Sequence, residues 1–398
     1  MIEILLAIFF ITVLLLFLSS GIWVAISMIG VSSIGMILFT SRPVGDAMAT
    51  TIWGASSSWT LTALPLFVWM GEILFRTKLS ENLFEGLAPW LQKLPGGLIH
   101  VNVVGCALFA AISGSSAATV ATVGKMSIPE LRKRKYPEKI LLGSLAGSGT
   151  LGLLIPPSII LIIYGVTVQE SIAKLFIAGI IPGIMIALIF MGYVIIWSLL
   201  NKNKMPLTEE NYSFLNKLSK SKQLIPVILL ILGVIGSIYT GIATATEAAS
   251  LGVVGALILS YFQKSLNLKT FKESLLGATK TSCMIAFILA GATFLSLAMG
   301  FTGLPRNLAI WIQNMELSPY VLIFVLMIFY IILGMFLDGI SAVVLTMAII
   351  EPMIRQAGFD MIWFGIFLVI VVEMAQITPP VGFNLFVLQG MANKDMGY

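Results

Sequence analysis

Short polar sequences interrupt two long apolar stretches of this chain, and their residue types are those that bind small cations. Ser113–Gly114–Ser115–Ser116 lies inside Pro95–Gly124, and Asp338–Gly339–Ile340–Ser341 lies inside Pro319–Ile354. Hydroxyl and carboxylate oxygens are hard ligands for hard cations such as Na⁺. Ser and Gly together also favour a turn over a continuous helix. We therefore expect two helical hairpins with polar tips.

Two double prolines should open the helices that contain them. They occur in Leu154–Ile155–Pro156–Pro157 and in Ile377–Thr378–Pro379–Pro380. A double proline removes two N–H donors and disfavours helical geometry in the residue before it, which frees carbonyl oxygens. The helix that restarts after each break presents an N-terminus with partial positive charge. Such breaks can bind a cation through carbonyls and a carboxylate through helix ends.

The composition indicates a membrane protein. Of 398 residues, 58% are hydrophobic and only 10% are charged, and the mean hydropathy is +1.03. A soluble chain of this length needs more surface charge. Apolar blocks such as Ile2–Leu18, Gly21–Phe39 and Ala245–Phe262 have roughly the 17–25 residues that cross about 30 Å of hydrocarbon. We expect an all-α polytopic membrane protein.

Basic residues set the expected orientation. They gather in Arg76–Lys93, Lys125–Lys139, Lys202–Lys222 and Lys264–Lys280, which we interpret as four cytoplasmic loops by the positive-inside rule. If the chain crossed the membrane only once between the first two basic segments, one of them would lie outside the cytoplasm. The stretch between them should therefore enter the membrane and turn back as a re-entrant hairpin. The same argument gives the second hairpin the opposite orientation.

The two halves share an order and spacing of prolines and glycines. Successive intervals are 19, 15 and 27 residues in the first half and 20, 13 and 27 in the second, counted over Pro95, Gly114, Pro129 and Pro156 and over Pro319, Gly339, Pro352 and Pro379. Each half thus has a hairpin followed by a broken helix. Combined with their opposite orientation, this pattern indicates the inverted repeat of secondary transporters.

Four acidic residues lie in or near apolar stretches, where an acid at mid-helix costs roughly 2.5–3.5 kcal/mol. We expect Asp338 to serve an ion or a substrate, or to cap the second arm of its hairpin. For Glu247, an N-cap role and a functional role both stay open. Glu72 and Glu373 are expected to pair within the bundle or to lie near an interface.

The sequence lacks the residues of several other chemistries. It has no P-loop, no dinucleotide fingerprint and no Gly-x-Ser-x-Gly motif, and His100 has no partner at metal-ligand spacing. Cys106 and Cys283 lie in apolar stretches and are expected to be buried thiols. We therefore expect neither an enzyme nor nucleotide-driven transport. A channel would need a continuous polar stripe along several spans, which we do not find.

Five stretches are specific to one protein family: Ala111–Thr119 (AISGSSAAT), Gly147–Ser158 (GSGTLGLLIPPS), Leu175–Gly183 (LFIAGIIPG), Phe336–Gly339 (FLDG) and Glu373–Gln389 (EMAQITPPVGFNLFVLQ). In them, and over nearly its whole length, the chain resembles the large membrane subunit (DctM type) of tripartite ATP-independent periplasmic (TRAP) transporters. The resemblance implies an elevator-type carrier of the bacterial inner membrane, in which a transport domain slides against a scaffold. It implies Na⁺-coupled import of a small organic acid, such as a C4-dicarboxylate or a sialic acid, without a cofactor.

The same resemblance implies specific residues and partners. A first Na⁺ site would use Ser113, Gly114, Ser115, Ser116, Gly147, Ser148, Gly149, Thr150 and Pro156, and a second would use Asp338, Gly339, Ser341, Gln376, Thr378 and Pro379. The substrate would lie between the tips, near Ser116, Ser158, Asp338 and Asn384. The partners would be a periplasmic binding protein and a small membrane subunit of Q type. Because the chain starts with the large subunit's spans, that subunit should be a separate protein.

The implied organisation is scaffold spans in 1–94, a first transport repeat in 95–183, connecting scaffold in 184–280 and a second repeat in 281–398. Ala245, Ala348 and Met361 stand where prolines are expected, and these departures bear on rigidity more than on ligand identity. Only Met391–Tyr398 follow where the family has another apolar segment, so we expect a shortened chain or a missing scaffold element. A stand-alone exchanger of organic anions or ions with the same hairpins remains the alternative.

Overall fold

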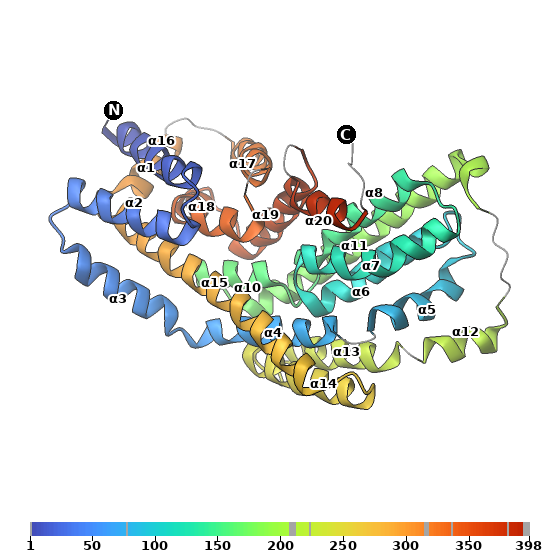
Figure 1. Ribbon diagram of the computed structural model, residues 1–398. Helices are drawn as coiled ribbons and strands as arrows, with labels where there is room; N and C mark the ends of the chain where they lie inside the picture. Colours follow the sequence, from blue (N-terminus) through green and yellow to red (C-terminus); the bar gives the residue numbers. More distant parts are fainter. Residues whose placement is uncertain are drawn as a thin grey trace.

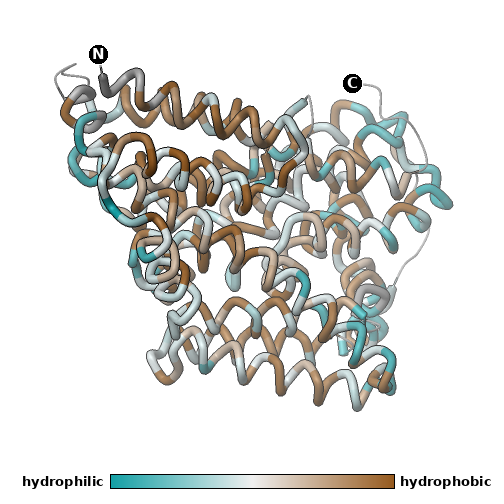
Figure 2. The backbone as a smooth tube through the Cα atoms, turned by 60° about the vertical axis from the view of Figure 1, so that its left-hand side comes forward, coloured by the Kyte–Doolittle hydropathy of each residue, from teal (hydrophilic) through white to brown (hydrophobic). Residues whose placement is uncertain are grey.

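The computed structural model describes residues 2–76, 79–206, 212–222, 224–313, 318–335, 337–379 and 382–392. Every regular element within these ranges is a helix, which confirms the predicted all-α class. Among the described helices, five are long and apolar enough to cross a membrane, or up to seven if two bent pairs each count as one span. Figure 2 shows hydrophobic residues along the helices and hydrophilic residues gathered at helix ends and connections.

A group of helices that we call the frame forms one side of the molecule. It consists of α1 (Ile2–Ser19), α2 (Val24–Phe39), α3 (Val44–Ser56), a short helical turn (Trp59–Thr62), α4 (Ala63–Phe75), α13 (Ile225–Tyr239), α14 (Ala245–Phe262) and α15 (Leu268–Thr302). The long α15 runs diagonally across Figure 1 and packs against α2, α3 and α4. A Cβ atom on Gly291 would lie 2.8 Å from the carbonyl oxygen of Ala25, so glycine permits α15 to approach the α2 backbone closely.

Four further helices of the described residues belong neither to the frame nor to the hairpins and broken helices described below. They are α5 (Leu79–Leu91), α11 (Ile172–Leu200), α12 (Phe214–Ser221) and α16 (Leu304–Gln313), with a short turn at Lys202–Lys204. On α11, the side chains of Ile181, Leu188 and Ile196 are all more than half exposed. A large exposed apolar face of this kind suits contact with lipid hydrocarbon.

The first hairpin consists of α6 (Ile99–Ser113) and α7 (Ser116–Lys133), which pack against each other. Gly114 ends α6 with φ of +59°, a left-handed conformation that glycine adopts without strain. Ser115 then caps α7, because its hydroxyl accepts a hydrogen bond from the amide of Ala118 at 3.5 Å. The break predicted from the Ser-Gly-Ser-Ser sequence is present.

The first broken helix has three parts, α8 (Glu138–Gly149), α9 (Leu151–Leu154) and α10 (Ile159–Thr167). Ile155 has extended backbone geometry before the double proline, as the steric effect of the following proline requires. The Pro156–Pro157 peptide bond is cis. Ser158 caps the restarting helix by accepting a hydrogen bond from the amide of Leu161 at 3.3 Å.

The second half has the same order of elements. Its hairpin is α17 (Pro319–Gly334) and α18 (Gly339–Gln356), and its broken helix is α19 (Met361–Gln376) and α20 (Phe383–Ala392). Asp338 caps α18 by accepting the amide hydrogen bond of Ser341 at 3.1 Å, which confirms the capping interpretation of this acid. Pro380 lies outside the described residues, but α19 ends and α20 begins on either side of the predicted break.

The hairpins and broken helices of the two halves pack against one another. We call these elements, α6–α10 and α17–α20, the inner body. In each half the first hairpin arm packs on its own broken helix, α6 on α8 and α9, and α17 on α19. Each second arm packs on its own broken helix and also on the helix that follows the other half's break, α7 on α20 and α18 on α10 (Figure 1). The inverted orientation of the halves in a membrane stays a prediction.

The structure corrects two local predictions. The segments interpreted as basic loops are largely helical, since α15 starts at Leu268 within Lys264–Lys280, and α5 and α7 occupy much of the first two segments. Lysines are tolerated there because they lie at helix ends or on exposed faces. Cys106 is fully buried as predicted, but Cys283 is exposed, because it shares with Met284 and Phe287 the side of α15 that faces away from the frame's core.

Candidate functional site

The first hairpin tip docks directly on the first broken helix. The amide of Ile159 donates a hydrogen bond to the carbonyl oxygen of Gly114 at 3.3 Å. A Cβ atom on Gly114 would lie 2.8 Å from the Pro157 carbonyl oxygen, and one on Gly152 would lie 2.6 Å from the Ser115 carbonyl oxygen. Both distances are too short for any side chain, so glycine is required at both positions. Backbone oxygens of the tip and of the break thus come together.

The other residues predicted for the first ion site take different positions. Gly149 faces α7, because its Cβ would lie 2.0 Å from a methyl group of Val120, whereas Gly147 faces Phe190 of α11. The hydroxyl of Ser148 donates to the Ser144 carbonyl at 2.5 Å, and that of Thr150 donates to the Gly147 carbonyl at 2.6 Å. These two hydroxyl protons are engaged by the backbone, which leaves only their oxygen lone pairs for a ligand.

A hydroxyl network stiffens the first tip. The hydroxyls of Ser113 and Thr119 are 2.9 Å apart, and that of Thr119 donates to the Ser115 carbonyl at 2.8 Å. The Ser113 hydroxyl is also 3.3 Å from the Ser115 carbonyl oxygen, so either hydroxyl can donate to the other. Sequence reasoning missed Thr119, although its position one turn after Ser115 is a signal that it faces the tip.

Ser116 connects the first tip to the second half of the chain. Its hydroxyl donates a hydrogen bond to Oε1 of Glu373 on α19 at 2.7 Å. Both side chains are buried, with 2% of Ser116 and 4% of Glu373 exposed. Glu373 was expected to pair within the bundle, and it does so with a tip serine 257 residues away. Local sequence signals do not reveal a partner at that separation.

The second tip lies beside the end of α19. A Cβ atom on Gly339 would lie 2.7 Å from Nε2 of Gln376 and 2.8 Å from Cγ1 of Val372. Ser341 is 1% exposed, and its hydroxyl has no hydrogen-bond partner among the described residues. Thr378 donates its hydroxyl to the carbonyl of Met374 at 2.6 Å, and Pro379 is exposed. The structure thus brings Gly339 to Gln376 at this tip.

The residues predicted to contact substrate differ in what they can offer. Ser158 is fully buried, donates its hydroxyl proton to the Leu153 carbonyl, and caps α10. When it is ionised, the Asp338 carboxylate can only accept hydrogen bonds and cannot donate one. Asn384, at the start of α20, is fully buried, and neither atom of its amide has a partner among the described residues. A carboxylate ligand needs donors, and among these residues Asn384 has the free N–H group.

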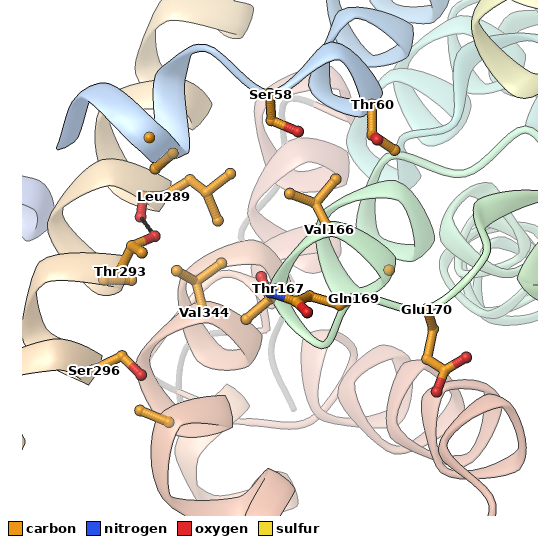
Figure 3. A pocket seen from close by; sticks show the side chains of 15 residues that line it. Ser58, Thr60, Val166, Thr167, Gln169, Glu170, Leu289, Thr293, Ser296 and Val344 are labelled. Carbon is orange, nitrogen blue, oxygen red and sulfur yellow. Dashed lines mark hydrogen bonds between the residues drawn. The ribbon is translucent and has the colours of Figure 1, made fainter. Parts of the chain in front are cut away.

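A cavity of about 480 Å³ lies between the frame and the inner body. Figure 3 shows Ser58 and Thr60 on one side of it, Thr293 and Ser296 of α15 on another, and Thr167, Gln169 and Glu170, at and just after the end of α10, on a third. The tip serines are not among its lining residues. From the sequence, we assigned no role to the hydroxyls that line it. Thr293 and Ser296, three residues apart on one helix face, are the missed signal.

A second cavity, of about 820 Å³, has a charged lining. It lies between α7, the α4–α5 region and α12, and its basic residues are Arg76, Lys125, Arg134 and Lys220. Two of these bases have acidic neighbours, since Arg76 pairs with Glu72 at 2.9 Å and Arg134 with Glu130 at 3.6 Å. The basic residues come from segments that the positive-inside rule places in the cytoplasm.

Three further predicted residues have structural positions. Glu247 is exposed and forms a capping box with Thr244 at the start of α14, with its carboxylate 2.8 Å from the Thr244 amide nitrogen. Glu72 forms the ion pair with Arg76 described above. His100 is fully buried, and its Nε2 is 2.9 Å from the carbonyl oxygen of Pro95. None of the three contacts either tip through a hydrogen bond in the described part of the chain.

Comparison with known proteins gives a family match over almost the whole chain. A family model described as "Tripartite ATP-independent periplasmic transporter, DctM component" matches residues 11–397. The C4-dicarboxylate TRAP transporter large permease protein DctM of Pseudomonas aeruginosa is 32% identical over 370 residues, which cover 93% of this chain and 86% of that protein. The sialic acid TRAP transporter large permease protein SiaM of Vibrio cholerae is 30% identical over 372 residues, with coverage of 93% and 86%.

Comparison with solved structures identifies a shared fold. The YdaH transporter of Alcanivorax borkumensis superimposes with a TM-score of 0.66, over 96% of this chain and 90% of that one. The two sequences are only 12% identical, so the likeness concerns the arrangement of helices alone.

Proposed function

The chain belongs to the family of DctM components of tripartite ATP-independent periplasmic transporters and is a large permease subunit of the bacterial inner membrane, and on that premise we propose that it imports a small organic acid together with Na⁺. Two relatives are named for C4-dicarboxylate and for sialic acid, both of which carry carboxylates. The proposed substrate of this chain is therefore a carboxylate of that size range.

The observation that carries the proposal is that each polar hairpin tip lies against a broken helix of the chain. At the first tip the carbonyl of Gly114 accepts a hydrogen bond from the Ile159 amide, and the carbonyl of Ser115 lies against Gly152. At the second tip the start of α18 meets Gln376. Irregular backbone at membrane depth is tolerated only where it is buried or lines a wet cavity. Carbonyls at such breaks coordinate Na⁺, and helix N-termini bind carboxylates, in secondary transporters.

An elevator movement is proposed for the inner body against the frame. The elements of the inner body pack on one another across the two halves, which favours their movement as one unit. The cavity of about 480 Å³ lies between the frame and parts of α10 and α18, beside the contact of α15 with α18. Weakly filled contacts of this kind allow one body to slide past another.

Two partners complete the proposal. A periplasmic binding protein would deliver the substrate, and a small membrane subunit would pack against the frame. The family description names a tripartite assembly, which supports both. Specificity for one acid would then reside largely in the binding protein.

Reconstitution in liposomes tests the proposal. The chain would be inserted with its small subunit, and uptake of radiolabelled C4-dicarboxylates and sialic acid would be measured in four conditions, with or without an inward Na⁺ gradient and with or without the binding protein. We expect uptake only when both are present. Equal uptake in all four conditions would reject the proposal. Na⁺-dependent uptake without any binding protein would favour the stand-alone exchanger.

A further inference from the structure

The buried carboxylate of Glu373 is not explained by the roles described so far. It lies on α19, in the broken helix of the second half, yet it contacts the tip of the hairpin of the first half through Ser116 at 2.7 Å. Ser116 is the first residue of α7. An acid in the middle of an apolar helix is unfavourable unless it has a partner or a function.

The surroundings of Glu373 leave its charge uncompensated by any side chain. Its Oε1 accepts one hydrogen bond, and its Oε2 has no partner among the described residues. The ion pairs in the described part of the chain join Arg76, Arg132, Arg134 and Arg355 to other acids, and none of them includes Glu373. A buried charge without a counter-charge is costly, because neither water nor an opposite charge stabilises it.

The geometry of Ser116 favours a cation as the missing partner. The Ser116 hydroxyl has one proton, and that proton is directed to Glu373. The lone pairs that remain on its oxygen can accept hydrogen bonds or coordinate a cation, but they cannot donate to a substrate carboxylate. The carbonyl of Ser115 lies in the same tip, beside Gly152.

A second group of polar atoms lies where α19, the helix of Glu373, gives way to α20. A Cβ atom on Gly382 would lie 3.5 Å from the carbonyl oxygen of Gln376, so α20 begins where α19 ends. Asn384, on the first turn of α20, has an amide oxygen without a partner among the described residues. Amide, hydroxyl, carbonyl and carboxylate oxygens are the ligand set of a hard cation.

We propose that Glu373 is the anionic ligand of the cation site at the first hairpin tip, where it neutralises a bound Na⁺ together with the oxygens of Ser116 and the tip backbone. The inference rests on the proposed Na⁺ coupling and adds to it a charged residue from the opposite half of the chain. Bound Na⁺ would then hold the first hairpin to α19. The coupling ion would thus join the two halves that must move together.

The variant that tests this is Glu373→Gln, measured in the reconstituted complex. Glutamine keeps the size of the side chain and can still accept the Ser116 hydrogen bond, so it removes the charge and little else. We expect the Na⁺ concentration for half-maximal uptake to rise at least tenfold, with the KM for the acid at saturating Na⁺ within twofold of the unmodified protein. The shift in unfolding temperature that Na⁺ produces should be lost in the same variant. Glu247→Gln, on an exposed cap, is the matched control and should change neither quantity.

Other outcomes separate this inference from the proposed function. If Ser116→Ala raises the half-saturating Na⁺ concentration but Glu373→Gln leaves it within twofold, the inference is wrong and Na⁺ coupling stands. If the unmodified protein transports without regard to Na⁺, the proposed function itself fails. Uptake driven by a proton gradient alone, and lost in Glu373→Gln, would assign the carboxylate to protons and overturn the inference. If Glu373→Gln does not fold, Glu373→Asp keeps the charge and should retain the Na⁺-dependent shift in unfolding temperature, and its absence would contradict the proposal.

Discussion

The two hairpin tips arise from similar sequences but are held in different ways. The first is fixed by polar contacts, through the Gly114 carbonyl to Ile159 and through the Ser116 hydroxyl to Glu373. The second caps its own helix through Asp338 and rests on side chains of α19. The arms of the first hairpin pack on each other, whereas α17 packs mainly on α19 rather than on α18. Similar spacing therefore does not imply similar chemistry.

The position of the acid is the main difference. Glu373 lies six residues before Pro379, and the position six residues before Pro156 in the first half is Thr150. The Thr150 hydroxyl bonds to the Gly147 carbonyl of its own helix. Each tip thus has one acid, but the acid at the first tip comes from the opposite half and that at the second tip, Asp338, is local. We infer that the first tip is the more rigid of the two.

The largest expected effect is from Gly152→Ala, compared with Gly339→Ala. The new Cβ at position 152 would meet backbone atoms of Ser115 and Ser116 at 2.6–2.7 Å, which cannot rotate away. Overpacking costs 1–3 kcal/mol, and we expect about 3 kcal/mol here together with loss of uptake. At position 339 the Cβ meets side-chain atoms of Gln376 and Val372, so a loss of about 1 kcal/mol is expected.

Thermal unfolding of the two glycine variants in detergent, followed by uptake in liposomes, measures this difference. Gly143→Ala is a suitable control, because nothing lies within 4 Å of a Cβ atom there. Equal destabilisation at positions 152 and 339 would contradict the view that the first tip is held by backbone and the second by side chains.

The next effect is from Ser116→Ala, compared with Ser341→Ala. Removal of the Ser116 hydroxyl leaves a buried oxygen of Glu373 without its hydrogen bond, which costs about 2 kcal/mol. The Ser341 hydroxyl has no partner among the described residues, so its removal should change stability by less than about 0.5 kcal/mol. Unfolding in Na⁺-free buffer is the measurement. If Ser341→Ala lost more stability than Ser116→Ala, the Ser341 hydroxyl would have a polar partner, and the contrast between the two tips would be wrong.

The sequence predicted those features that depend on neighbouring residues. The four helix breaks follow from Gly114, from Asp338 and from the two double prolines, because these residues impose their conformations locally. The caps by Asp338 and Glu247 were anticipated for the same reason. The helical structure in Lys264–Lys280 was not predicted. The lysines spaced along this segment suggest a cytoplasmic loop, but lysine is also a good helix former.

Features that depend on distant parts of the chain were not predictable. The contact between Ser116 and Glu373 requires α19 to cross the first hairpin tip, which no local pattern encodes. The hydroxyl-lined cavity takes residues from four separate segments, among them Ser58, Thr167 and Thr293. The assignment of the site residues to two Na⁺ sites and one substrate site stays a prediction. Gly147 faces Phe190, and the Ser158 hydroxyl already bonds to the backbone, which limits the ligands that these two residues can provide.

A smaller effect is expected at Asp338, where capping and charge can be separated. Asp338→Ala removes the hydrogen bond to the Ser341 amide and should cost about 1 kcal/mol of stability. Asp338→Asn keeps a capping oxygen, so its stability should stay within about 0.3 kcal/mol of the unmodified protein. If Asp338 also binds Na⁺, both variants should raise the half-saturating Na⁺ concentration equally. If only Asp338→Ala does so, the acid is a cap alone.

The smallest effect on stability is expected from Thr378→Val, which makes the second break chemically like the first. Thr378 precedes Pro379 as Ile155 precedes Pro156, so only the second break has a hydroxyl at this place. That hydroxyl bonds to the Met374 carbonyl of its own helix, and valine preserves its shape, so stability should change by less than about 0.5 kcal/mol. If the hydroxyl oxygen also coordinates Na⁺, loss of one ligand should raise the half-saturating Na⁺ concentration about fivefold, which corresponds to about 1 kcal/mol. An unchanged Na⁺ titration would remove Thr378 from the second ion site and leave backbone carbonyls, Asp338, Ser341 and Gln376 as its candidate ligands. The two tips would then differ in the source of their acid but not in their use of hydroxyls at the break.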